Sequence, residues 1–379
     1  MSARILLSPP HLDDRATSLL LEAVASNWIA PLGPFVDRFE DALASLSHRR
    51  FALATCSGTA AIHLALLSLG VGEGDYVICQ SLTFAGTVNP VCYVGGIPVF
   101  VDSERDTWNM DPDLTHEAIR WCLQRGRRPK AILVVHLYGM PARMDELLRL
   151  SEEYAIPLIE DAAEALGSRY RGEPCGAFGA ASIFSFNGNK IITTSGGGAL
   201  LSHDEPLIGR ARHLATQARD AAPHYEHTKI GYNYRLSNLL AAVGCAQLDV
   251  LNDRVASRRA VYDWYCARLA SSGCLTMQPE VAQAFSNRWL TAAVIADHVG
   301  DLEAAAIAAR ILGACATAQI DARPVWKPMH LQPVFRDAPS FGGTVSQSLF
   351  ERGICLPSGS RLTAEELEGV GTAVSSVLA

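Results

Sequence analysis

The chain has 379 residues, 49% of them apolar, and carries a formal net charge of -7. This length and apolar content predict a globular protein with one large domain or two, and the acidic balance provides no basic field for nucleic acid. No apolar run is as long as a membrane span, and the opening "MSARILLSPPHLDD" lacks the apolar core of a signal peptide. The cysteines show no spacing typical of a metal site. We therefore expect a cytoplasmic protein without bound metal that contacts neither nucleic acid nor membrane.

The first element with a chemical signature is an apolar helix in "CSGTAAIHLALLSLG", which begins at Ser57, Gly58 and Thr59. The unpaired N–H groups and the dipole at its start would attract an anion such as a phosphate. A serine or threonine at this place is also the usual N-cap of a helix. Taken alone, the segment favours an ordinary cap.

Five apolar runs predict buried strands, and segments with helical spacing lie among them. Such alternation predicts a mostly parallel sheet with helices on both faces, a three-layer α/β/α domain whose active site lies at the carboxyl ends of the strands. The predicted strands are 76–80, 98–102, 131–139, 157–161 and 182–186, and the helical patterns cover 114–126 and 143–155.

Two of these strands are followed or ended by side chains that would face a cleft. Asp161 ends the strand 157–161, three residues before Glu164, and Phe84 follows the strand 76–80. A carboxylate at such a strand end points toward the usual position of a ligand, although a lone acid is more often a cap or a surface residue. An aromatic residue at the position of Phe84 is likewise more often part of a core than a platform for a ligand ring.

A single lysine, Lys190, stands between two apolar runs in "FSFNGNKIITTSGGGALLS" (184–202), ahead of three glycines at 196–198. The turn residues 187–189 between β-forming runs predict a strand, a turn and a second strand. A lysine on such a turn is usually solvated. The glycines would let the backbone pass close to a ligand.

The pattern changes after 231–270, a turn followed by long helical stretches. An apolar strand at 291–296 and helical patterns at 301–318 and 364–378 predict a smaller α+β domain with its own strands and two helices. The expected division is a large domain of residues 1–250 and a small domain of residues 251–379.

One ligand would match the helix start, the carboxylate and the lysine together. These groups require an anionic phosphate, a protonatable ring and an electrophile, and pyridoxal phosphate (PLP) has all three. A lysine amine condenses with its aldehyde. An aspartate beside the pyridine nitrogen raises the pKa of the pyridinium and keeps the ring protonated.

Eight stretches of the chain carry a resemblance to a known family. They are "SNWIAPLGPFVDRFE", "SGTAAIHLALLSLGVGEGD", "TFAGTVNPVCYVGGIPVFVD", "VVHLYGMPARMDEL", "IEDAAEALGS", "FSFNGNKIITTSGGG", "GYNYRLSNLLAAVGCAQLDVL" and "RPVWKPMHLQPVF". Over nearly its whole length the chain resembles the DegT-type nucleotide-sugar aminotransferases. This implies the aspartate-aminotransferase-like fold, fold type I of PLP enzymes.

The resemblance implies a role for each matching residue. Lys190 would be the catalytic lysine that binds the PLP aldehyde, and Asp161 would pair with the pyridine nitrogen. Glu164 would lie near the phenolic oxygen, and Phe84 would stack on the ring. The remaining cofactor contacts would be to the phosphate, from Ser57, Gly58, Thr59 and Ser185 of the same chain and from Asn233 of a neighbouring subunit.

The resemblance also implies a reaction and its partners. L-glutamate would leave the cofactor in its pyridoxamine form, and a nucleotide-linked keto sugar would then accept the amine. A shared site would require a homodimer. The sequence does not identify the group that holds the glutamate carboxylates, for which Arg219 and Arg235 are candidates.

The segment 323–335, "RPVWKPMHLQPVF", predicts a wall of the substrate site stiffened by prolines. Its cationic side chains, Arg323 and Lys327, suit a diphosphate. The alternative is that the segment is only a crossover, whose Trp326 packs on the small domain. With "LSPPH" and "SNWIAPLG", it resembles the subgroup that aminates C4 of UDP-linked 4-keto-6-deoxy-N-acetylglucosamine, toward UDP-N-acetylbacillosamine. GDP- or dTDP-linked sugars, amination at C3, a ring-free substrate and a regulatory relative without catalysis remain alternatives. The expected substrate contacts are Arg235, Trp326, Lys327 and His330.

Overall fold

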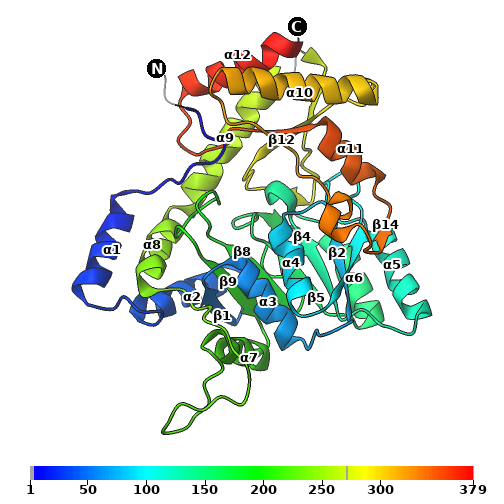
Figure 1. The fold of residues 1–379 in the computed structure, drawn as a ribbon. Coiled ribbons are helices and arrows are strands. Elements are labelled where there is room, and N and C mark those ends of the chain that lie inside the picture. The colour runs from blue at the N-terminus through cyan, green and yellow to red at the C-terminus, as the bar shows by residue number, and fades with distance from the viewer. Residues whose placement is uncertain (1–3, 270–271, 379) are drawn as a thin grey trace.

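The computed structural model describes residues 4–269 and 272–378. An eight-stranded sheet lies at the centre of its larger part (Figure 1), in the order β1-β9-β8-β5-β4-β2-β3-β14. Strands β8, β5, β4, β2, β3 and β14 are parallel, whereas β9 is antiparallel to both of its neighbours, β1 and β8. The predicted, mostly parallel sheet is confirmed. In sheet order the strands span Phe51–Thr55, Gly198–Ser202, Ala181–Ser185, Leu158–Asp161, Ala131–Val135, Tyr76–Gln80, Ile97–Val101 and Ser340–Phe341.

Helices cover both faces of this sheet because successive strand residues point to opposite sides. In β4, Ala131 and Leu133 pack with α3, α4 and α7, whereas Ile132 and Val134 pack with α5 and α6. Helices α2 and α8 pack on the side chains of β1 and β9 that point away from α3. The three-layer prediction is therefore confirmed. The helices are α2 (Pro34–Leu46), α3 (Gly58–Ser68), α4 (Ala85–Tyr93), α5 (Pro112–Gln124), α6 (Met144–Tyr154), α7 (Glu205–Ala215) and α8 (Asn238–Asp249), with α1 (Asp14–Ala25) against α8.

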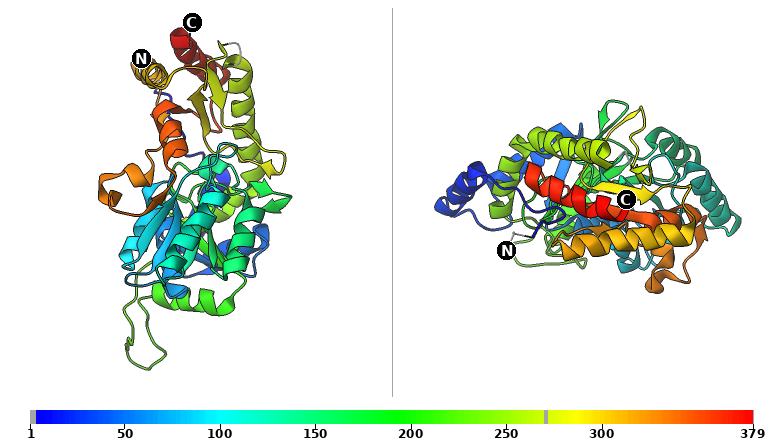
Figure 2. Two further views of the ribbon diagram at one scale, coloured as in Figure 1. Left: turned by 90° about the vertical axis from the view of Figure 1, so that its right-hand side faces the viewer. Right: turned by 90° about the horizontal axis from the view of Figure 1, so that it is seen from above.

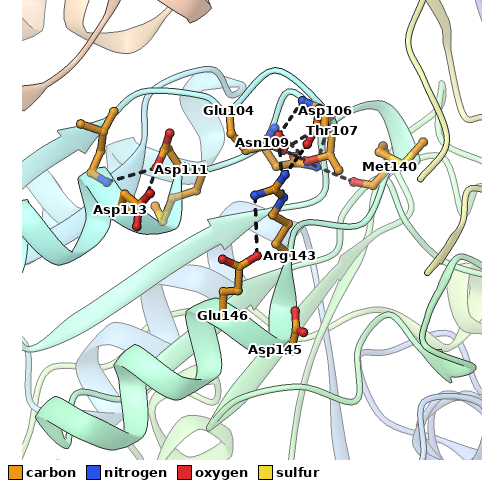
Figure 3. Close-up of polar contacts among 12 residues, drawn as sticks. Glu104, Asp106, Thr107, Asn109, Asp111, Asp113, Met140, Arg143, Asp145 and Glu146 are labelled. Carbon is orange, nitrogen blue, oxygen red and sulfur yellow. Dashed lines mark hydrogen bonds and ion pairs between the residues drawn. The ribbon is translucent and has the colours of Figure 1, made fainter. Parts of the chain in front are cut away.

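The prediction of one strand over 131–139 was wrong beyond Val135. A short 3₁₀ turn (Leu137–Gly139) follows, in which Tyr138 has a left-handed φ of 57°. Asn109 holds this turn: its amide donates to Met140 O at 2.8 Å and its side-chain oxygen accepts Leu137 N–H at 2.8 Å. Figure 3 shows Asn109 beside Arg143, which forms ion pairs with Asp106 and Glu146 at the start of α6.

The smaller part has its own sheet, in the order β10-β12-β15-β13. It contains three helices among the described residues, one more than predicted, because α11 (Thr344–Arg352) was not anticipated. The described chain begins and ends here (Figures 1 and 2), because Arg4 contacts Asp321 and Leu378 is the last residue of α12. The elements are β10 (Leu275–Met277), β12 (Thr291–Ile295), β13 (Arg323–Pro324), β15 (Gly353–Leu356), α10 (Asp301–Thr317), α11 and α12 (Ala364–Leu378), with α9 (Leu251–Leu269) leading in from α8. A separate small sheet joins β6 (Arg169–Tyr170), β7 (Glu173–Pro174) and β11 (Ala284–Phe285).

Two segments cross the expected boundary between residues 250 and 251. Ile5, near the start of the chain, pairs with Ile320 of the smaller part, and β14 joins the large sheet beside β3. The division by residue number therefore stays a prediction. None of the helices in the described residues is long and apolar enough to cross a membrane.

Candidate active site

A cavity of about 450 Å³ lies where β5 and β8 end and α3 begins. The carboxyl ends of neighbouring parallel strands meet at this edge, which is the usual position of a ligand in such sheets. Lys190, Trp289 and Trp326 line the cavity with residues of these elements. The predicted residues that line it are Ser57, Gly58, Thr59, Phe84, Asp161, Glu164, Ser185, Lys190 and Trp326.

The start of α3 combines the two alternatives that the sequence left open. Ser57 is the N-cap, and its side chain accepts the Ala60 N–H at 3.1 Å. The preceding N–H groups of Gly58 and Thr59 have no acceptor within the helix, and both residues line the cavity. The helix start is therefore capped and still presents donors to an anion.

The three glycines at 196–198 have different surroundings, so the reason for the absence of a side chain is not the same at each. Gly196 and Gly197 line the cavity. Gly198 does not line the cavity, and it is required for a different reason than predicted: a Cβ there would lie 2.4 Å from Gly58 N. The absence of a side chain at Gly198 thus serves the packing of β9 against the start of α3.

Asp161 is a buried carboxylate, 4% exposed, at the end of β5. Oδ2 accepts from the Thr87 hydroxyl at 2.8 Å, and Oδ1 accepts from Ala163 N–H at 3.1 Å. Burial raises the pKa of Asp161, and the Thr87 bond partly opposes this shift. A cationic ligand group beside Asp161 would favour its ionised form.

Lys190 and Glu164 face each other in the cavity. The Lys190 amine lies 3.4 Å from Glu164 Oε1 and 4.1 Å from the centre of the Trp289 ring. Glu164 Oε2 accepts Tyr138 N–H at 2.7 Å, so the left-handed turn at Tyr138 holds this carboxylate. Burial raises the pKa of Glu164 to about 6, although the Lys190 charge acts in the opposite direction.

Sequence reasoning missed Thr87, Tyr138 and Trp289 as members of the site. The three lie 74, 26 and 99 residues from their partners Asp161, Glu164 and Lys190, respectively. No local pattern signals such contacts.

Aromatic residues form one side of the cavity. Phe84 lines the cavity and is 60% exposed, which is a large exposed fraction for an apolar aromatic residue. Its ring centre lies 5.7 Å from that of Trp326, which in turn contacts Tyr138 at 5.0 Å. An exposed ring in a cavity offers a flat surface for a ligand ring.

A buried polar cluster lies behind Asp161. Ala142 N–H donates to His136 Nδ1 at 3.0 Å, which places the imidazole proton on Nε2, and Nε2 donates to Glu160 Oε1 at 2.8 Å. The Cys175 sulfur completes a group whose possible ligand atoms lie within 4.8 Å of one another. Glu160 also accepts Phe178 N–H at 2.9 Å. These bonds already engage the imidazole and carboxylate, and the expectation of no metal stays a prediction.

Two predicted residues near "GYNYR" lie outside the cavity of their own chain. Asn233 is exposed, and its backbone pairs with Thr216. The Arg235 side chain is 10% exposed and pairs with Glu40 at 3.4 Å. Any contact of either residue with ligand would be with the site of another subunit, which stays a prediction.

The segment 323–335 is only partly a wall of the cavity. Trp326 lines it, whereas Lys327 is exposed to solvent and His330 faces the loop after β2. His330 Nδ1 bonds the Ser81 hydroxyl at 2.7 Å, and burial lowers the pKa of His330. The expected direct substrate contacts of Lys327 and His330 stay predictions.

The donor set fits PLP. The start of α3 and Ser185 offer donors for a phosphate, and Gly58 approaches Ser185 closely, because a Cβ on Gly58 would lie 3.2 Å from Ser185 Cβ, a tight contact. Asp161 offers a carboxylate for a ring nitrogen, Phe84 an aromatic surface and Lys190 an amine. A single cavity collects all of them.

Comparisons with known proteins indicate the family of this chain. EpsN of Bacillus subtilis (strain 168), provisionally named a pyridoxal phosphate-dependent aminotransferase, is 50% identical over 370 residues, covering 97% of this chain and 94% of EpsN. GDP-perosamine synthase of Caulobacter vibrioides is 35% identical over 376 residues, covering 99% of this chain and 98% of that protein.

A solved structure gives the same result. Spr1654 of Streptococcus pneumoniae, provisionally named a sugar aminotransferase and determined in its PLP form, matches with a TM-score of 0.88 and 26% identity over the full length of both chains. The sequence pattern of the DegT/DnrJ/EryC1/StrS aminotransferase family matches residues 10–375. The chain therefore belongs to the DegT/DnrJ/EryC1/StrS aminotransferase family, as an enzyme of fold type I whose cofactor is PLP.

Proposed function

We propose that this enzyme transfers the amino group of L-glutamate to C4 of a UDP-linked 4-keto-6-deoxy-N-acetylhexosamine, toward UDP-N-acetylbacillosamine or a related diamino sugar. The position of Lys190 is the main support for the proposed amine transfer, because its amine shares a cavity with Asp161 and lies 3.4 Å from Glu164. A regulatory relative without catalysis would have no need for this arrangement.

Each residue of the cavity has a task in this proposal. When bound, PLP supplies an aldehyde for the amine and an electron sink for the carbanion formed at the donor. Lys190 binds the cofactor and, once free, moves a proton between the donor carbon and the cofactor. Asp161 keeps the ring nitrogen protonated, and Phe84 covers the ring face. The start of α3 and Ser185 hold the phosphate.

The choice of a UDP-linked 4-keto sugar rests on the resemblance of "LSPPH", "SNWIAPLG" and the 323–335 segment to one subgroup. Trp326, which lines the cavity, would contact the sugar or the nucleotide. A GDP-linked 4-keto sugar is the second candidate, because the Caulobacter relative that covers 99% of this chain is named GDP-perosamine synthase.

The substrate proposal is tested with a panel of keto sugars. The pyridoxamine form of the enzyme is mixed with UDP-, GDP- and dTDP-linked 4-keto sugars and with a 3-keto sugar, and kcat/KM is measured for each. We expect the highest value for the UDP-linked sugar. A higher value for the GDP-linked sugar would contradict the proposed substrate but not the aminotransferase activity.

The lysine is tested separately. Borohydride reduction of the PLP-loaded enzyme should attach the cofactor covalently to Lys190, as read by peptide mass spectrometry. Lys190→Ala should bind PLP only noncovalently and lose transamination, whereas Lys327→Ala should be labelled like the wild type. A label on another lysine would contradict the assignment.

We also propose that the active enzyme is a homodimer in which Asn233 reaches the phosphate of the partner's site. Support comes from the exposed position of Asn233 beside a segment that extends from the body after α7 (Figure 1). This segment presents large apolar side chains, with Tyr225 79% and Ile230 87% exposed. Arg219, which stacks on Tyr225 at 4.3 Å, is a candidate for the glutamate carboxylates.

The shared site is tested by subunit mixing. Inactive Lys190→Ala protein is mixed with an inactive double variant, Asn233→Ala and Arg235→Ala. One site of each heterodimer then combines two wild-type halves, so part of the activity should return. No recovery after verified subunit exchange would show that each chain builds its own site. The expectations of a cytoplasmic enzyme without nucleic-acid or membrane partners stay predictions.

A further inference from the structure

Two side chains from distant parts of the chain donate to the same backbone oxygen, the carbonyl of Asn189. The Ser8 hydroxyl donates to it at 2.6 Å, and the Trp289 indole N–H donates to it at 2.6 Å. A carbonyl oxygen has two lone pairs, and both are engaged here. Asn189 directly precedes Lys190, so these bonds fix the peptide group that carries the lysine.

One buried arginine, Arg258 of α9, holds both donors. Its Nη2 donates to Ser8 Oγ at 3.0 Å, and its Nη1 donates to Trp289 O at 2.5 Å. Arg258 is 1% exposed, and burial lowers its pKa to about 9. Among the described residues, no carboxylate forms an ion pair with it. A buried cation without a counterion is costly, and the hydrogen bonds of Arg258 to Ser8 and Trp289 offset part of that cost.

The start of the chain is fastened to the smaller part of the structure. Ile5 exchanges backbone bonds with Gln319 and Asp321 at 3.1 and 2.8 Å, and Leu7 O accepts Ser358 N–H at 2.8 Å. Ser8 is the next residue, and it reaches across to the turn after β8. The hydrogen bonds among Ser8, Arg258, Trp289 and the Asn189 carbonyl, here called the Ser8–Arg258 bridge, therefore join the smaller part to the segment that bears Lys190.

We propose that Ser8 and Arg258 are positioning residues for Lys190. Their bonds hold the Asn189–Lys190 peptide so that the amine stays over the Trp289 ring, 4.1 Å from its centre, and 3.4 Å from Glu164. The orientation of a reacting group is worth large rate factors, because a small misplacement raises the barrier to each proton transfer. This inference rests on the proposed catalytic role of Lys190.

Ser8→Ala tests the bridge directly, because it removes one donor to Asn189 and the acceptor of Arg258. We expect kcat to fall by about tenfold or more, with KM for the nucleotide sugar changed by less than about twofold. Ser8→Thr, which keeps the hydroxyl, should retain most of the activity. Ser18→Ala is the matched control, because among the described residues the Ser18 hydroxyl bonds only to Asp14 O, on the exposed side of α1.

A second readout needs neither substrate nor cofactor. In the apoenzyme, amide hydrogen exchange of the peptide 187–194 should be faster in Ser8→Ala than in the wild type, and it should return to the wild-type rate in Ser8→Thr. If the substrate proposal fails, this measurement is unaffected. If exchange and kcat of Ser8→Ala both match the wild type, the positioning role is wrong.

Arg258→Lys gives an independent test, because an ammonium group cannot bridge both donors with the planar geometry of a guanidinium. If both residues act through one bridge, Ser8→Ala should lower kcat much less in the Arg258→Lys background than in the wild type. Simple multiplication of the two single effects would contradict a shared bridge. Thermal unfolding of each variant separates this coupling from a loss of folded protein.

Discussion

The amine of Lys190 lies 3.4 Å from Oε1 of Glu164, and both side chains are largely buried, with 11% and 4% of their surface exposed. This contact pairs a cation with a carboxylate whose pKa burial raises. The charge of Glu164 therefore depends on pH in a range where most carboxylates are already ionised.

The free energy of unfolding of the apoenzyme should show this titration. Burial raises the pKa of Glu164 from 4.5 to about 6, so the folded state binds the proton more tightly than the unfolded state. The stability contributed by Glu164 is thus present below pH 4.5 and is lost as the pH rises through 6, by about 2 kcal/mol. Glu164→Gln should lack this decline. Denaturant unfolding of both apoenzymes between pH 4.5 and 7 measures the difference, and parallel profiles would contradict the shift.

Asp161→Asn should fold normally and lose activity by about a hundredfold or more, because a neutral amide does not keep the pyridine nitrogen protonated. The loss should appear in the single half-reaction with glutamate, measured by stopped-flow absorbance. Asp204→Asn is a suitable control, since Asp204 caps α7 and asparagine caps a helix equally well. An unchanged half-reaction would exclude Asp161 as the partner of the ring.

Gly198→Ala should weaken PLP binding, although Gly198 does not line the cavity. Its new Cβ would lie 2.4 Å from Gly58 N and from Ser57 C, and backbone atoms cannot move aside as a side chain would. The start of α3 would shift, and with it the donors for the phosphate. Gly209→Ala, which has nothing within 4 Å, is the control. Equilibrium titration with PLP measures the change, and equal affinities of the two variants would contradict this explanation.

His330→Ala should raise KM for the nucleotide sugar more than it lowers kcat. The structure places His330 on Ser81, with 2.7 Å between Nδ1 and Oγ, so we expect the effect to pass through the position of the segment 326–330. Ser81→Ala should therefore reproduce most of it. A large effect of His330→Ala that Ser81→Ala does not share would instead indicate direct contact with the substrate.

Much of the fold was predictable because its signals are local. Strands buried on both faces appear as short apolar runs, and this held for β2, β3, β5 and β8. The run 131–139 misled for the same reason: Leu137 and Tyr138 continue the apolar run, but Tyr138 has a left-handed φ and its N–H donates to Glu164. The short strand β14 gave no signal, because its place beside β3 depends on a distant pairing.

By itself, the sequence determined the chemistry that this chain carries: an amine at Lys190, a carboxylate at the end of a parallel strand, and a helix that starts with free N–H groups. Residue type and local backbone pattern place these groups along the chain, and their combination with the family resemblance implied their roles. Only the tertiary structure decided which side chains hold these groups, since Thr87, Trp289 and Ser8 reach the site from far along the chain. Their contacts arise from the packing of whole elements in three dimensions, which no window of neighbouring residues records.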